Sequence, residues 1–147
     1  MKRILMGIGN ELNGDDAVGH LIAKGFRSDG WTSIPCSTVP ESFASIIRRE
    51  SPDLLVIVDA ADFGGFPGEF KIIPKENLDS AGVGTHGMPL RHLVEYLGEM
   101  AGEVVFIGIQ PGSMRMGAGL SPAVESARKR LIGLLRNHEL DLIPKLL

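Results

Sequence analysis

GIGNELNGDDAVGH, residues 7–20, follows the apolar run Ile4–Met6 and leads into an apolar helical pattern that begins at Ala17. A short apolar run before a glycine-rich turn is typical of a buried strand that connects to a helix. Two adjacent carboxylates, Asp15 and Asp16, lie in this turn. An Asp at this position can cap the helix by accepting a hydrogen bond from an N–H group of its first turn. We therefore predict that one of the two carboxylates caps the helix and that the other is available for chemistry.

The composition favours one compact domain and excludes several classes of function. The chain has 147 residues, of which 44% are hydrophobic, so we expect a single domain over residues 1–147 with a sizeable core. A formal net charge of −3 argues against nucleic-acid binding. Cys36 is the only cysteine, which excludes an internal disulfide and a cysteine-based zinc site. No segment approaches the ~20 apolar residues of a membrane span. We therefore expect a cytoplasmic protein that contacts neither a membrane nor a nucleic acid.

Strand and helix patterns alternate along the rest of the chain. The expected strands are Lys2–Ile8, Trp31–Pro35, Leu54–Val58, Glu69–Ile73 and Glu103–Gln110. The expected helices are Asp16–Phe26, Pro40–Glu50, Pro89–Met100 and Ser121–Asn137. Only about nine residues separate the third and fourth strands, whereas a parallel crossover needs a dozen or more. The fourth strand is therefore predicted to run antiparallel to the third, at an edge of the sheet. The whole pattern predicts an α/β fold, a three-layer α/β/α sandwich with a five-stranded, mostly parallel twisted sheet.

Candidate site residues follow the carboxyl ends of the expected parallel strands, where open α/β sheets bind their ligands. Asp16 follows the first strand, Asp59 ends the third, and His86 lies in the long loop before the third helix. Two carboxylates and an imidazole suit a divalent metal such as nickel or zinc. They equally suit general acid–base chemistry without a metal. Taken alone, each residue also has an ordinary interpretation, as a helix cap, a turn cap and a loop histidine respectively. No role is assigned to the other histidines, His20, His92 and His138.

The glycines of the first turn do not fit a dinucleotide-binding fingerprint. The pattern G-x-G-x-x-G requires glycine where Leu12 stands, and the second strand ends in Ser33–Pro35 without an acidic residue. The carboxylates of Asp15 and Asp16 would also repel a pyrophosphate at this turn. The sequence therefore excludes NAD binding, and we expect no organic cofactor.

Four motifs in order resemble the signature of the hydrogenase maturation endopeptidases, which process the large subunit of [NiFe] hydrogenases. These motifs are Gly7-x-Gly9-Asn10 with Gly14-Asp15-Asp16-x-x-Gly19, Ile57–Ala60 with Pro67–Glu69, Thr85–Leu90, and Phe106–Pro111. The resemblance extends over nearly the whole chain, to about Leu135. It is strongest to the members that serve hydrogenases of the formate-hydrogenlyase type.

This resemblance implies a five-stranded α/β/α sandwich and an endopeptidase, grouped with aspartic-type peptidases. Its substrate would be the precursor of the large subunit, from which it removes a C-terminal extension after nickel insertion. Nickel would arrive with the precursor and serve as the recognition element. The family's catalytic and nickel-contacting residues fall on Asp16, Asp59 and His86. We expect the protein to act as a monomer. Two alternatives remain at this point, a non-catalytic chaperone of the immature large subunit and a metal-dependent small-molecule hydrolase.

Overall fold

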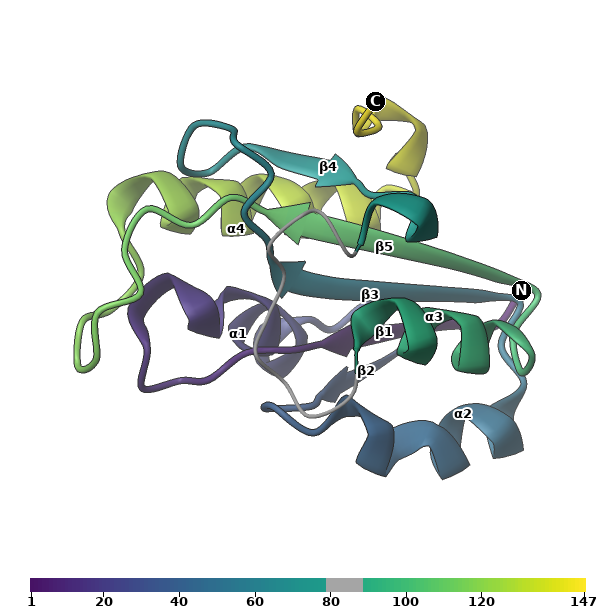
Figure 1. Ribbon diagram of the computed structural model, residues 1–147. Coiled ribbons are helices and arrows are strands. Elements are labelled where there is room, and N and C mark those ends of the chain that lie inside the picture. Colours follow the sequence, from purple (N-terminus) through teal and green to yellow (C-terminus); the bar gives the residue numbers. More distant parts are fainter. Residues whose placement is uncertain (79–88) are drawn as a thin grey trace.

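A computed structural model describes residues 1–78 and 89–147 and has a five-stranded sheet at its centre (Figure 1). The strands are β1 Arg3–Gly7, β2 Trp31–Pro35, β3 Leu54–Ala60, β4 Phe70–Ile72 and β5 Glu103–Ile109. Their order in the sheet is β2-β1-β3-β5-β4. The first four strands in this order are parallel, and β4 is antiparallel to β5. The predicted parallel sheet with one antiparallel edge strand is confirmed.

Helices cover both faces of the sheet. The helices are α1 Val18–Gly25, α2 Ala44–Glu50, α3 Leu90–Gly98 and α4 Pro122–Arg136, with short 3₁₀ turns η1 Gly14–Ala17, η2 Pro40–Phe43, η3 Lys75–Asn77 and η4 Leu140–Leu142. Alternate strand residues point to opposite faces. Leu5 and Val56 pack with α1 and α4, whereas Ile4 and Ile57 pack with α2 and α3. This arrangement is the predicted three-layer sandwich. Among the described residues, every helix is too short or too polar to cross a bilayer.

The connection between β3 and β4 crosses the end of β5. The predicted antiparallel direction and edge position of β4 are confirmed, but β4 forms its hydrogen bonds with β5 rather than with β3. The side-chain oxygen of Gln110, directly after β5, accepts hydrogen bonds from the N–H groups of Phe63 (2.9 Å) and Gly65 (3.1 Å). Its Nε2 donates to Asp62 Oδ1 at 3.2 Å. These bonds hold the connection over β5, so a short segment suffices to place β4 beyond it.

Two glycines of the opening motif bring α1 close to the sheet. A Cβ atom on Gly7 would overlap the carbonyl oxygen of Gly19, and a Cβ atom on Gly19 would overlap the carbonyl oxygen of Val58. Glycine is required where backbones approach this closely. These two glycines of the motif therefore serve helix–sheet packing.

Replacing Gly19 by alanine is expected to lower the free energy of unfolding by about 1–3 kcal/mol, because the added methyl group forces backbone apart in a packed core. Gly25→Ala is the matched control, since a Cβ atom there meets nothing within 4 Å. Urea denaturation of the two variants measures the difference. Equal stabilities of Gly19→Ala and the wild type would contradict the close packing of α1.

Candidate active site

The candidate site lies at the carboxyl ends of β1, β3 and β5, on the left of Figure 1. There the N–H group of Ile8 donates to the carbonyl oxygen of Val58 at 2.9 Å, which joins the ends of β1 and β3. Gly9 packs so closely on η1 that a Cβ atom would overlap the carbonyl oxygen of Asp16. The segments that carry Asp16 and Asp59 are therefore neighbours at the carboxyl ends of the parallel strands, as predicted.

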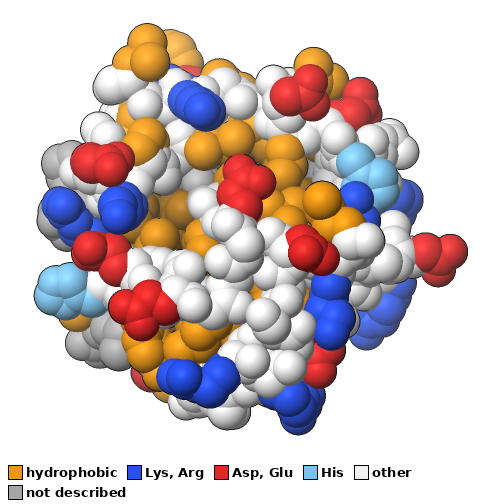
Figure 2. Space-filling model, turned by 90° about the vertical axis from the view of Figure 1, so that its right-hand side faces the viewer, with side chains coloured by type: hydrophobic (Ala, Val, Ile, Leu, Met, Phe, Trp, Pro, Cys, Tyr) orange, Lys and Arg blue, Asp and Glu red, His pale blue; other side chains and the backbone are white. Residues whose placement is uncertain are grey.

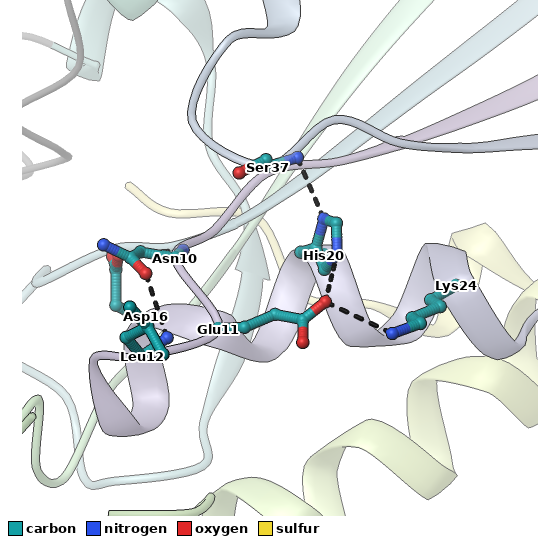
Figure 3. Close-up of polar contacts among 7 residues, drawn as sticks. All are labelled: Asn10, Glu11, Leu12, Asp16, His20, Lys24 and Ser37. Atoms are coloured by element: carbon teal, nitrogen blue, oxygen red, sulfur yellow. Dashed lines mark hydrogen bonds and ion pairs between the residues drawn. The ribbon is translucent and has the colours of Figure 1, made fainter. Parts of the chain in front are cut away.

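Asp16 lies half-buried in η1, and the turn after β1 orients its carboxylate. Its Oδ2 accepts a hydrogen bond from the backbone N–H group of Asn10 at 3.1 Å. The side-chain oxygen of Asn10 in turn accepts from the N–H group of Leu12 at 2.9 Å, which fixes the turn (Figure 3). Oδ1 of Asp16 has no hydrogen bond from the described residues. Asp16 is thus held by one oxygen and presents the other.

Asp59 is the more enclosed carboxylate, with an exposed fraction of 0% near the end of β3. Its Oδ1 accepts a hydrogen bond from the N–H group of Ala60 at 2.8 Å. In a buried position of low dielectric, a carboxylate interacts with a nearby cation much more strongly than at the surface. The third predicted residue, His86, lies outside the described residues.

Asp15 has a different role from the one that the sequence suggests. The prediction that Asp15 or Asp16 caps the following helix is wrong, because neither makes a capping hydrogen bond. The carboxylate of Asp15 instead accepts from the N–H groups of Gly112 (2.7 Å), Ser113 (2.9 Å) and Ser121 (2.7 Å), and from the Ser121 hydroxyl at 2.8 Å. Four donors from one distant loop satisfy both of its oxygens.

The charge of Asp15 stabilises the loop between β5 and α4. Burial raises the pKa of the Asp15 carboxyl, but the hydrogen bonds from Ser113, Ser121 and Gly112 outweigh it and lower the pKa below its ordinary value. Ser121 lies at the predicted start of α4 with Pro122 after it, but its hydroxyl binds Asp15 rather than capping the helix. Asp15 is therefore an anchor beside the site, and the sequence gives no signal of this pairing.

Cys36 is not a candidate nucleophile. It is fully buried, and this burial raises the pKa of its thiol to about 12. The thiolate is the reactive form of cysteine, so a thiol with this pKa is inert near neutral pH. Because Cys36 is the only cysteine of the chain, catalysis by a cysteine nucleophile is excluded.

Within residues 1–78 and 89–147, no three His, Cys, Asp or Glu side chains are arranged to hold a metal ion. A recess of about 1180 Å³ lies elsewhere, between α3, β5 and the C-terminal segment, and its lining includes neither Asp16 nor Asp59. Figure 2 shows the end of the molecule where the parallel strands begin, with hydrophobic side chains bordered by acidic and basic ones. The candidate site is at the opposite end.

Comparisons with known proteins show which protein family this chain resembles. Residues 17–138 match the family model of the HycI hydrogenase maturation protease. The chain is 38% identical over 141 residues to the hydrogenase 3 maturation protease of Escherichia coli strain K12, covering 90% of each chain. The solution structure of the endopeptidase HycI from Escherichia coli superposes with a TM-score of 0.89 at 32% identity, covering 100% of this chain and 97% of that one. The crystal structure of a [NiFe] hydrogenase maturation protease HycI from Thermococcus kodakarensis KOD1 has a TM-score of 0.82 at 38% identity, covering 95% and 92%.

Together, the sandwich and these matches define an endopeptidase of the α/β/α class. The chain belongs to the hydrogenase maturation protease family. The predicted family, fold and class of enzyme, a hydrolase of peptide bonds, are confirmed. Endopeptidase activity takes the place of the two alternatives, the chaperone and the small-molecule hydrolase.

Proposed function

We propose that this endopeptidase removes the C-terminal extension of a [NiFe] hydrogenase large-subunit precursor once nickel has been inserted. The observation that carries the proposal is the pair of carboxylates at one sheet edge, with Asp59 enclosed and Asp16 half-buried and presenting one oxygen. Nickel belongs to the substrate and is bound by the precursor's own ligands. Asp16, Asp59 and His86 contact this nickel, and the enzyme needs no organic cofactor. The names of the related proteases support this choice of substrate.

The contact with nickel positions the precursor, so that only a precursor with inserted nickel is placed correctly for cleavage. A precursor whose nickel is bound by the enzyme's carboxylates holds its scissile peptide bond in one place, which raises the rate of attack. A carboxylate can then take a proton from the attacking water. Asp16 suits this role, since Oδ1 has no hydrogen bond from the described residues. A precursor without nickel lacks this anchor, so its peptide bond is not held at the carboxylates.

Exposed hydrophobic side chains on the loops around the site form the proposed contact with the precursor. These side chains are Leu12 (66% exposed), Phe66 (79%), Met114 (47%) and Met116 (76%). The carbonyl oxygen of Leu12 accepts from the N–H group of Gly117 at 2.8 Å, so the first and last of these loops touch. Exposed hydrophobic groups that gather in one region often mark a protein-binding surface. The sequence places two further hydrophobic residues, Phe63 and Met88, on loops near the site. Phe63 packs partly buried against the core, and Met88 lies outside the described residues.

The double variant Phe66→Ser/Met116→Ser is expected to raise KM for the precursor about tenfold while kcat changes less than about threefold, because hydrophobic contact area is lost away from the reacting bond. The matched control is Leu142→Ser in η4, which is 61% exposed. Steady-state cleavage at several precursor concentrations separates the two constants. An equal rise in KM in the control would show that these loops are not the contact surface.

Cleavage itself is tested with purified protein and the nickel-loaded precursor of a cognate hydrogenase, followed by intact mass. We expect the loss of one discrete C-terminal peptide. Stable binding without cleavage would contradict the proposal. We propose that the protein acts as a monomer of a single domain in the cytoplasm, where reducing conditions suit its free cysteine.

A further inference from the structure

His20 of α1 makes two hydrogen bonds to loops that border the candidate site. Its side chain is only 13% exposed. Nδ1 accepts a hydrogen bond from the backbone N–H group of Ser37 at 2.9 Å, and Nε2 lies 2.6 Å from Oε1 of Glu11 (Figure 3). Because Nδ1 is an acceptor here, the imidazole proton lies on Nε2 and is donated to Glu11. Both ring nitrogens are therefore used, one toward each loop.

The loop after β2 depends on the first of these bonds. Ser37 has a φ of 51°, in the left-handed region that residues other than glycine rarely adopt. Its N–H group donates to His20, and its carbonyl oxygen accepts from the N–H group of Gly9 at 2.8 Å. Two hydrogen bonds thus hold an unfavourable backbone conformation. Through Ser37, His20 fixes the position of Gly9.

The second bond fixes the turn after β1 on the other side. The hydrogen bond from His20 is the largest contribution that lowers the pKa of the Glu11 carboxyl, followed by those of Lys24, whose Nζ lies 3.4 Å from the same oxygen. Glu11 is therefore a charged acceptor, and charge-assisted hydrogen bonds are stronger than neutral ones. His20 holds Glu11 directly.

The two hydrogen bonds of His20 hold the residues on either side of Asn10. Gly9 and Glu11 are the neighbours of Asn10, whose N–H group donates to Oδ2 of Asp16. We propose that His20 is a positioning residue, which fixes Asn10 from both sides and so holds the Asp16 carboxylate in its working orientation. This inference rests on the proposed role of Asp16. It also revises the sequence interpretation, which assigned His20 no role.

The variant His20→Phe keeps a ring in place but removes both hydrogen bonds. We expect kcat for precursor cleavage to fall about tenfold or more, because small misplacements of a reacting group have large effects on rate, with KM within about twofold. Glu11→Gln keeps an acceptor for Nε2, and we expect its kcat to stay within about threefold of the wild type. The matched control is His92→Phe, at an exposed position of α3. An unchanged kcat in His20→Phe would overturn the proposal.

A second readout does not depend on cleavage. Nitrogen NMR of the wild type should show His20 with a proton on Nε2 and none on Nδ1. In His20→Phe, the signals of the Asn10 amide and of the Asp16 carboxyl should shift, whereas in His92→Phe they should not. Unshifted signals in His20→Phe would overturn the proposal even if Asp16 proves essential. If His20→Phe does not fold, Glu11→Ala removes only the hydrogen bond between His20 and Glu11. The Glu11 side chain is 44% exposed, and we expect the same signals of Asn10 and Asp16 to shift. Full activity of Asp16→Asn together with shifted signals would reject the role of Asp16 and leave the hydrogen-bond network intact.

Discussion

Asp16→Asn and Asp59→Asn should each lower the rate of precursor cleavage by about 10³-fold or more, because each removes the negative charge that contacts nickel or takes a proton from water. Both substitutions preserve shape. An asparagine side-chain oxygen can still accept a hydrogen bond from the N–H group of Asn10 at position 16 and from that of Ala60 at position 59. We therefore expect the fold to be retained. Single-turnover cleavage by intact mass measures the rate, and circular dichroism checks the fold.

Asp62→Asn is the matched control for these two variants. Asp62 is an exposed carboxylate on the loop after β3, and its Oδ1 accepts from the Gly64 N–H group and from Gln110 Nε2. An asparagine oxygen can accept the same bonds, so cleavage should stay within about threefold of the wild-type rate. Full activity of both Asp16→Asn and Asp59→Asn would remove these two residues from the active site.

Asp15→Asn should be the most destabilising of the isosteric changes, lowering the free energy of unfolding by about 2–4 kcal/mol. Asp15 accepts hydrogen bonds from three backbone N–H groups and one hydroxyl. In asparagine an NH₂ group replaces one of the two oxygens, so either the Ser121 N–H group at Oδ1 or the three donors at Oδ2 would lose their acceptor. Since the volume is unchanged, the loss reports hydrogen bonding and charge rather than packing. Urea denaturation measures it, and a variant as stable as the wild type would contradict the anchoring role.

The pH dependence of stability gives an independent test of Asp15. Its pKa in the folded protein is lowered from the ordinary value of 3.8, so the unfolded chain binds the proton more tightly. The stabilisation from Asp15 is therefore fully present above this ordinary value and is lost as the pH falls through the lower pKa of the folded state. We expect the wild type to lose more stability below about pH 4 than Asp15→Asn does. Parallel losses in the two proteins would contradict the charged state of Asp15.

The sheet was predictable because its strands carry strong local signals. Leu54–Val58 is a continuous apolar run, and every residue of β3 is buried. The bounds of β2, Trp31–Pro35, were predicted correctly. The starts of the first two helices were less predictable. The first helix was expected to begin at Asp16, but η1 occupies Gly14–Ala17 and α1 begins at Val18. Gly14 adopts a positive φ of 54° there, and its backbone lies so close to Ser113 that an added Cβ atom would lie 2.6 Å from the Ser113 carbonyl oxygen, a tertiary contact that no local pattern indicates.

The candidate site was predictable only where topology alone determines position. Asp16 and Asp59 follow from the rule that ligands bind at the carboxyl ends of parallel strands. The roles of Asp15 and His20 do not follow from any local pattern. The partners of Asp15 lie 97 to 106 residues away in the chain, and the N–H group that His20 binds lies 17 residues away. Such pairings are decided by tertiary structure, as is the pairing of β4 with β5.

The most direct test compares the nickel-loaded precursor with the same precursor lacking nickel. Each form is incubated with the purified enzyme under identical conditions, and the C-terminus is followed by intact mass. The proposed mechanism predicts that the loaded form loses one discrete C-terminal peptide, while the nickel-free form stays intact. Cleavage of both forms at equal rates would contradict nickel recognition by Asp16, Asp59 and His86.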